Sequence, residues 1–251
     1  MTSIDINCDM GESFGAFSIG QDEALMEYVS SVNIACGFHG GDPSVMRKTV
    51  HAAARRGLAI GAHPGYPDLQ GFGRRDIKFS TDEIYDMVLY QVGALKAFAE
   101  AAGTMLYHVK PHGALYNFAA KDAPAAAAIA KAVFDADPRL RFVGLSGSEL
   151  LLAGQKAGLK TVSEVFADRT YQDDGTLTPR ASKGALIENE AEAARQVVDM
   201  VLYHKVRALS GKEIPIKPDS VCIHGDGKNA LAYARAIVHE LKANHVSIAR
   251  P

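Results

Sequence analysis

Short apolar runs alternate along this chain with longer segments in which apolar residues recur at helical spacing. The short runs predict strands and the longer segments predict helices. Strands are expected at residues 3–8, 32–36, 58–62, 104–109, 141–145, 160–165 and 220–224. Helices are expected at residues 22–29, 43–56, 81–102, 122–135, 147–156, 190–208 and 226–242. This alternation indicates right-handed βα units around a parallel sheet.

Seven such units favour a closed or nearly closed (β/α) barrel over a doubly wound sheet, although periodicity alone does not separate the two. The helix expected at 81–102 carries a clear start signal, because Ser80 and Glu83 form a capping pattern ahead of an apolar stripe. The longest irregular stretches, 64–80 and 166–189, hold Gly, Pro, Arg and Asp. We expect them to form loops over one end of the barrel.

Composition narrows the class of protein. With 251 residues and 47% apolar content, the chain can bury one large core, so a single domain over residues 1–251 is expected. The net charge is −2 with acids and bases interspersed, which argues against a nucleic acid or an anionic membrane as partner. We find no signal-peptide pattern and no run of about 18 apolar residues, so a cytoplasmic location is expected. The three cysteines have no CxxC spacing and are interpreted as buried free thiols.

The first expected strand has an unusual polar face. Asp5, Asn7 and Asp9 alternate with apolar residues and therefore share one side of the strand. A barrel strand is covered on both sides, so buried acids there need a cation, hydrogen bonds or a metal. One interpretation is a structural network of acids and amides. The other, which we favour, is that Asp9 and Glu12 at the end of this strand belong to an active site.

Five of the nine histidines lie where an expected strand ends in a loop rich in Gly and Pro: His39, His63, His108, His112 and His224. The carboxyl ends of barrel strands are where such folds carry their chemistry. Imidazole suits both proton transfer near neutral pH and the binding of a borderline metal. The pattern therefore predicts an enzyme.

Five blocks of sequence resemble the signature of the LamB/YcsF family, the A subunit of the bacterial 5-oxoprolinase. They are Asp5-x-Asn-x-Asp-x-Gly-Glu12, Asn33-x-Ala-Cys-Gly-Phe-His-x-Gly-Asp-Pro43, Gly61-Ala-His-Pro-Gly-Tyr-Pro-Asp68, Val109-Lys-Pro-His-Gly-Ala-Leu-Tyr116 and Glu164-x-Phe-Ala-Asp-Arg-x-Tyr171. The resemblance implies an irregular seven-stranded (β/α) barrel similar to polysaccharide and chitooligosaccharide deacetylases. It also implies ATP-dependent opening of the lactam of 5-oxoproline to L-glutamate, together with partner subunits B and C.

The resemblance also suggests roles for residues of the first four units. Asp9, His39 and His63 resemble the Asp/His/His metal set of the related deacetylases, which suits a divalent metal with an open position. The same residues could instead form a metal-free acid/base cluster. Lys110 and His112 follow the fourth expected strand and could hold the substrate carboxylate or the oxyanion. Asp9, Glu12, His39, Lys110 and His112 are accordingly expected to be catalytic.

Later loops supply further candidates. Asp168 and Arg169 could pair with each other, or Arg169 could clamp a carboxylate or phosphate. His224 and Asp226 follow the last expected strand. We expect Asp168 and Asp226 to be catalytic and Arg169 and His224 to bind the cofactor. Two neighbouring loop arginines are further candidate anion ligands: Arg74 and Arg75.

The sequence has no P-loop motif, so the ATP of the reaction is expected to bind wholly or partly on the partner subunits. This chain would then supply the hydrolytic site. Two alternatives remain open. One is a metal-dependent carbohydrate deacetylase, and the other is a non-catalytic subunit that binds a lactam or regulates its partners.

Overall fold

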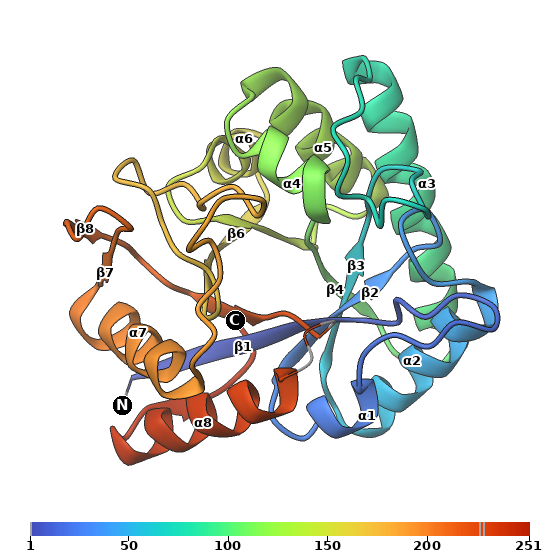
Figure 1. The fold of residues 1–251 in the computed structure, drawn as a ribbon. Coiled ribbons are helices and arrows are strands. Elements are labelled where there is room, and N and C mark those ends of the chain that lie inside the picture. Colours follow the sequence, from blue (N-terminus) through green and yellow to red (C-terminus); the bar gives the residue numbers. More distant parts are fainter. Residues whose placement is uncertain (1, 226, 228) are drawn as a thin grey trace.

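The computed structural model describes residues 2–225, 227 and 229–251. Seven parallel strands form a closed ring in the order β1-β2-β3-β4-β5-β6-β9, and β9 pairs back onto β1 (Figure 1). The expected closed seven-stranded barrel is confirmed. The strands of the ring are β1 (Ser3–Met10), β2 (Ser31–Ala35), β3 (Ala59–His63), β4 (Leu106–Val109), β5 (Arg141–Leu145), β6 (Lys160–Phe166) and β9 (Ser220–Ile223).

Helices surround the ring, as Figure 1 shows. They are α1 (Asp22–Leu25), α2 (Pro43–Arg55), α3 (Thr81–Ala101), α4 (Gly113–Ala119), α5 (Ala123–Ala136), α6 (Glu149–Lys156), α7 (Glu190–Tyr203) and α8 (Ala230–Ala243). The capping box expected at Ser80 and Glu83 is present at the start of α3. No helix in the described part of the chain is long and apolar enough to cross a bilayer.

The structure departs from the expected elements near residue 204. The expected helix 190–208 ends at Tyr203, because His204 adopts a left-handed conformation with φ 53°. The chain then forms a short antiparallel pair, β7 (Lys205–Arg207) with β8 (Glu213–Pro215). Helix α4 and the two-residue strand β10 (Ser247–Ile248) were also not expected from the sequence.

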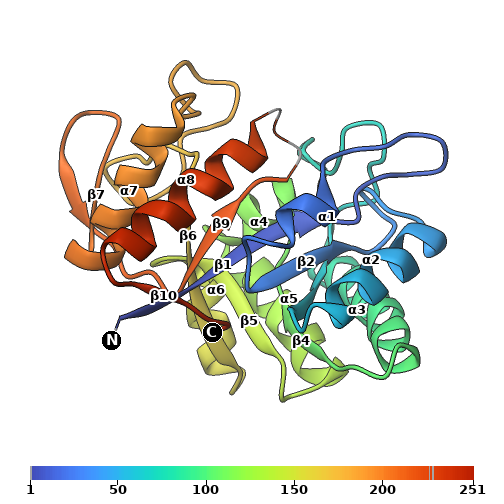
Figure 2. The ribbon, with the colours of Figure 1, turned by 90° about the horizontal axis from the view of Figure 1, so that it is seen from below.

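The two ends of the barrel differ. The marked chain ends lie at one end of the barrel and the long loops at the other (Figure 2). Strand β10 pairs with the start of β1, and Pro251 reaches the barrel interior, where the hydroxyl of Tyr107 donates to its carbonyl oxygen. The loops after β1, β3 and β6 gather at the opposite, carboxyl end of the strands, which is where the candidate site lies.

Candidate active site

The interior of the barrel is polar along β1. Asp5, Asn7 and Asp9 point inward, while the alternating apolar residues of the strand are fully or almost fully buried on the outer side. At the amino ends of the strands, Asp5 accepts hydrogen bonds from the hydroxyls of Ser30, Ser31 and Ser220. Burial outweighs these bonds and raises the pKa of Asp5 to about 6.

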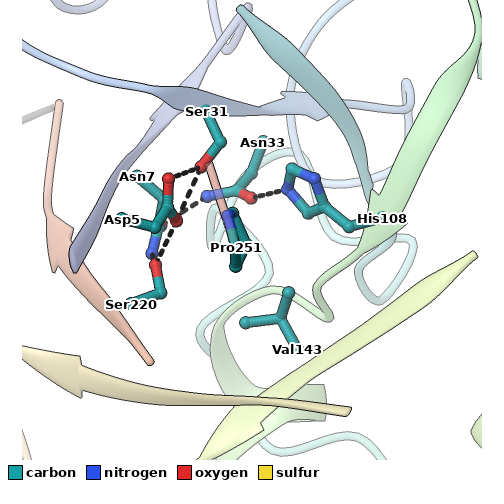
Figure 3. Close-up of a pocket in the computed structure, with 8 residues that line it drawn as sticks. All are labelled: Asp5, Asn7, Ser31, Asn33, His108, Val143, Ser220 and Pro251. Carbon is teal, nitrogen blue, oxygen red and sulfur yellow. Dashed lines mark hydrogen bonds between the residues drawn. The ribbon is translucent and has the colours of Figure 1, made fainter. Parts of the chain in front are cut away.

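Figure 3 shows this lower part of the interior, where polar side chains from four strands surround Pro251. The ring of His108 lies here, and its Nε2 donates to Asn33 Oδ1 at 2.7 Å. Burial lowers the pKa of His108 to about 3, so the ring is neutral. His108 therefore belongs to the polar core and not to the cluster of histidines at the other end of the barrel.

Lys110 lies at the centre of the interior network. Its ammonium donates to Asp9 Oδ1 and to Glu164 Oε1, both at 2.9 Å, and to Asn7 Oδ1 at 3.2 Å. Burial opposes the charge of Lys110, but the neighbouring anions outweigh it and raise its pKa well above the usual value. All three ammonium protons thus have acceptors inside the barrel. Lys110 thus holds the buried carboxylates in place, and its expected contact with substrate remains a prediction.

Both carboxylate oxygens of Asp9 also have close partners. Its Oδ1 accepts from Asn33 Nδ2 at 2.8 Å and from Lys110, and its Oδ2 lies 3.3 Å from His63 Nε2. Although burial opposes ionisation, the interactions with His63 and with the ammonium of Lys110 keep the pKa of Asp9 well below its usual value. A carboxylate with so low a pKa and with both oxygens occupied is a poor general base, so we interpret Asp9 as a fixed negative charge.

Three histidine rings and one carboxylate form a cluster above Asp9. The rings of His39 and His112 stack with centroids 3.6 Å apart and an interplanar angle of 3°, and His63 stands edge-on to both. Glu12 Oε1 lies 3.2 Å from His39 Nε2 and 3.7 Å from His112 Nδ1. Burial, aided by neighbouring imidazoles, lowers the pKa of His39 and of His112 well below the usual value. Both rings are therefore neutral.

Asp168 and His224 form a separate pair at the edge of the site. His224 Nδ1 lies 2.9 Å and 3.0 Å from the two oxygens of Asp168, and the side chains of His224 and Asp168 are 12% and 19% exposed. Burial opposes ionisation of Asp168, but its interaction with His224 holds the pKa of Asp168 below the usual value. The ring of His224 stacks on Phe166 at 5.5 Å. This dyad is open to solvent, unlike the buried histidines of the cluster.

Of the two alternatives left open for Asp168 and Arg169, pairing with each other is not the arrangement in the structure. Asp168 bonds His224, and the guanidinium of Arg169 donates to the backbone oxygens of Thr178 and Ala185. Arg169 is 4% exposed, so it holds the loop 167–189 together. Its expected role in cofactor binding remains a prediction.

The remaining loop candidates differ from one another. Arg75 is paired with Asp68, whereas the guanidinium of Arg74 lies 4.8 Å from the ring centroid of Phe72. Phe72 in turn contacts the rings of His39 and His112 edge-on, which places Arg74 beside the histidine cluster. The candidate Asp226 lies outside the described residues.

Comparison with known proteins identifies the family of this chain. The model of the LamB/YcsF family matches residues 4–251. The chain belongs to the LamB/YcsF family. A relative from Bacillus licheniformis, named as the A subunit of 5-oxoprolinase, is 57% identical over 248 residues, which is 99% of this chain and 98% of the relative. The sequence resemblance to the family is confirmed.

Two solved structures are similar in fold to this LamB/YcsF chain. The lactam utilization protein from Thermus thermophilus is 47% identical with a TM-score of 0.94, and the match covers 99% of each chain. A peptidoglycan deacetylase variant from Bacillus subtilis matches with a TM-score of 0.50 at 9% identity, covering 99% of this chain and 87% of the deacetylase. At that identity the second match shows a shared fold alone.

The donor atoms of the cluster fit a divalent metal. Glu12, His39, His63 and His112 each offer an oxygen or nitrogen, and these atoms all lie within 4.8 Å of one another. Imidazole and carboxylate are ligands that zinc and similar ions bind. Of the expected set of Asp9, His39 and His63, the two histidines belong to this cluster, while Asp9 lies 3.3 Å from His63 and also forms a second group with Cys222 and His224. A candidate metal-binding His/Glu cluster therefore exists, with a different membership from the expected one.

Sequence reasoning missed Glu164 as part of this site. Its Oε2 accepts from the hydroxyl of Tyr116 at 2.7 Å, and its Oε1 accepts from Asn7 and Lys110. The signal was available, because Glu164 is the one acid within an expected strand of otherwise uncharged residues from 161 to 165. A charged side chain in a strand covered on both faces needs a buried partner.

Proposed function

We propose that this chain is the hydrolytic subunit of an ATP-dependent 5-oxoprolinase, which opens the lactam of 5-oxoproline to L-glutamate with partner subunits B and C. The relative from Bacillus licheniformis carries the name of the A subunit of 5-oxoprolinase, and its identity of 57% over nearly the whole of both chains supports this substrate. The observation that supports a hydrolytic role is the partly exposed dyad of Asp168 and His224 beside the charged interior.

In this proposal His224 is the general base. Asp168 accepts from His224 Nδ1, which fixes the tautomer and leaves the lone pair of Nε2 free to take a proton from water. A donor atom of His224 lies within 4.8 Å of a carboxylate oxygen of Asp9 and of the sulfur of Cys222. Asp9 there adds negative charge, which favours the imidazolium that forms when His224 takes up the proton.

The reaction then follows from these positions. Water adds its oxygen to the lactam carbonyl carbon as His224 Nε2 takes one of its protons. The carbon–nitrogen bond of the tetrahedral intermediate breaks, and the ring nitrogen receives the proton back from His224, which leaves an amine and a carboxyl group. A lactam is a stabilised amide, so transfer of the terminal phosphoryl group of ATP to its carbonyl oxygen, which releases ADP, would make this addition faster. Breaking the carbon–nitrogen bond of the phosphorylated adduct then leaves an acyl phosphate, which a second water hydrolyses to the carboxylate and inorganic phosphate.

The ATP site belongs to the partner subunits in this proposal. The chain has no P-loop motif, and the activated lactam would pass to the site described above. We assign Arg74 to the substrate carboxylate, because its guanidinium stacks on Phe72 beside the histidine cluster. A metal at the His/Glu cluster, when bound, would supply fixed positive charge near the carbonyl oxygen.

The test is an assay of the reconstituted complex. The chain is mixed with B and C, 5-oxoproline and ATP, and the release of glutamate and ADP is measured with each component omitted in turn. Asp168→Asn should lower kcat by about 10³- to 10⁴-fold, because an orienting carboxylate is replaced by an amide that stabilises the wrong tautomer. The matched control is His239→Asn on the exposed face of α8, which should leave kcat unchanged.

Two outcomes would contradict the proposal. If an assembled complex makes no glutamate, the substrate assignment is wrong. If glutamate forms at an equal rate with Asp168→Asn, the dyad is not the hydrolytic site and the chain is better described as a binding or regulatory subunit.

A further inference from the structure

A single glutamine on the outer ring of helices binds the backbone on both sides of Asp168. Gln196 lies on α7, and its Nε2 donates to the backbone oxygens of Arg169 at 3.0 Å, Phe166 at 3.2 Å and Ala167 at 3.3 Å. Three carbonyl oxygens that converge on one point repel one another, so this backbone geometry needs a donor there. The two amide protons of Gln196, shared among the three oxygens, supply it.

The other contacts of this segment come from the backbone. The backbone oxygen of Asp168 accepts from the N–H of Ile187 at 3.0 Å, and the N–H of Ala167 donates to the backbone oxygen of Cys222 on β9 at 3.1 Å. The side chain of Asp168 then reaches His224 Nδ1 at 2.9 Å. Of the groups that hold this backbone next to Asp168, the glutamine amide is the one that a substitution can remove.

Helix α7 gives the glutamine a fixed base. Ala193, Val197 and Met200 on this helix are fully buried, and Gln196 between them is partly buried. Asp168, in contrast, lies near the start of the long loop 167–189, just after the end of β6. Groups carried on loops are placed less precisely than groups carried on helices or strands. The contact from α7 therefore gives the start of the loop the fixed position of the helix.

From this geometry we propose that Gln196 is a positioning residue that holds Asp168 against His224 and acts on the reaction only through that pair. The inference rests on the proposed function, because it takes the dyad as the site of proton transfer. The amide of Gln196 is bound to backbone oxygens and does not exchange a proton with the reactants. Its effect comes from geometry, since a displacement of about 1 Å in a catalytic group can cost about 100-fold in rate.

The first test needs no reaction. A proton held between His224 Nδ1 and Asp168 gives a downfield NMR resonance, which Asp168→Asn identifies by removing it. Gln196→Met keeps the approximate shape of the side chain but has no donor, so this resonance should broaden or disappear. The matched control is Gln155→Met on α6, where the exposed amide lies 3.5 Å from the hydroxyl of Thr161. In the control the resonance should remain.

The second test uses the reconstituted complex. Gln196→Met should lower kcat by about 10- to 100-fold and change KM by less than about twofold. When Asp168→Asn is already present, the same substitution should lower kcat further by less than about threefold, because residues that act as a unit are not additive. A substitution that only loosens the fold would lower kcat by the same factor in both backgrounds.

Circular dichroism and thermal melting verify that each variant folds. If Gln196→Met folds poorly, Gln196→Glu takes its place. The glutamate has the same shape, removes the donor protons and turns a carboxylate towards the three carbonyl oxygens. The same loss of the downfield resonance and the same pattern of kcat are expected.

Three results would overturn the inference. An unchanged resonance in the folded Gln196 variants would show that Asp168 and His224 pair without the glutamine. Equal factors in the two backgrounds would show that Gln196 acts on the fold as a whole. A rise in KM without a fall in kcat would place Gln196 in substrate binding. A complete complex that forms no glutamate would contradict the proposed function, and the NMR test would still decide whether Gln196 holds the pair.

Discussion

The buried ammonium of Lys110 offers the sharpest test of the barrel interior. Lys110→Met keeps the length of the side chain and removes the charge that faces Asp9 and Glu164, each at 2.9 Å. At an effective dielectric constant of about 20, each contact is worth about 6 kcal/mol of Coulomb energy. The desolvation cost of the ions offsets much of this energy. The net loss on breaking such a buried group is therefore about 3 to 5 kcal/mol of unfolding free energy.

The loss should also depend on pH. Without Lys110, burial dominates the environment of Asp9, so the pKa of Asp9 in the folded variant rises above its unfolded value of about 3.9. A carboxyl group whose pKa is higher in the folded state than in the unfolded state lowers the free energy of unfolding as pH rises through the folded pKa. Relative to the unaltered protein, Lys110→Met should lose about 3 to 5 kcal/mol of unfolding free energy at pH 8 and less at pH 5.

Urea denaturation followed by circular dichroism at pH 8 and pH 5 measures both quantities. The matched control is Lys131→Met, because Lys131 pairs with Asp135 on the surface and is 66% exposed. Its unfolding midpoint should not change, since exposed ion pairs contribute little. A loss below about 1 kcal/mol at pH 8, or an equal loss at both pH values, would refute the reasoning about Lys110.

Further predictions concern Asp5 on β1, Gly61 on β3 and, as a control for Gly61, Gly93 on α3. The pKa of Asp5 is raised to about 6, so its contribution to stability is present below about pH 4 and is lost as pH rises through 6. The free energy of unfolding, measured with urea, should fall by about 3 kcal/mol between pH 4 and pH 7, and Asp5→Asn should remove this fall. A variant with the same pH profile as the unaltered protein would contradict the prediction. Gly61→Ala should destabilise by about 3 kcal/mol, because a Cβ there would lie 2.0 Å from His108 Nε2. A Cβ added at Gly93 would meet nothing within 4 Å, so Gly93→Ala should stabilise α3 by about 1 kcal/mol. Thermal melting should therefore show a lower midpoint for Gly61→Ala and a higher midpoint for Gly93→Ala.

The strands of the ring could be predicted because each is covered on both sides and reads as a short apolar run. All seven were placed within two residues at either end. The end of α7 could not be predicted, since Val206 and Leu209 continue the apolar pattern of the helix. Only the left-handed turn at His204, which delivers Lys205 to its pairing with β8, ends it.

The sequence indicated which end of the barrel carries the candidate residues, but not which of them contact one another. Asp9, His39 and His63 lie at or just after the carboxyl ends of parallel strands, which meet at one end of the barrel. The partner of each polar group depends on distances that the sequence does not contain. Lys110 thus turned inward to Glu164, and Asp168 paired with His224, which lies 56 residues away, in place of its neighbour Arg169.

The closure of the ring by β9 has a consequence for how the protein folds. Asp5 on β1 pairs with Ser220 on β9, and the two residues are 215 positions apart. Contacts that join such distant segments are the slowest to form. During synthesis β1 is made early, but the edge that pairs with β9 has no partner until residue 220 is available. The nascent chain therefore exposes an unpaired strand edge for most of its synthesis. Such an edge can pair with another chain and aggregate, or it can be bound by a chaperone.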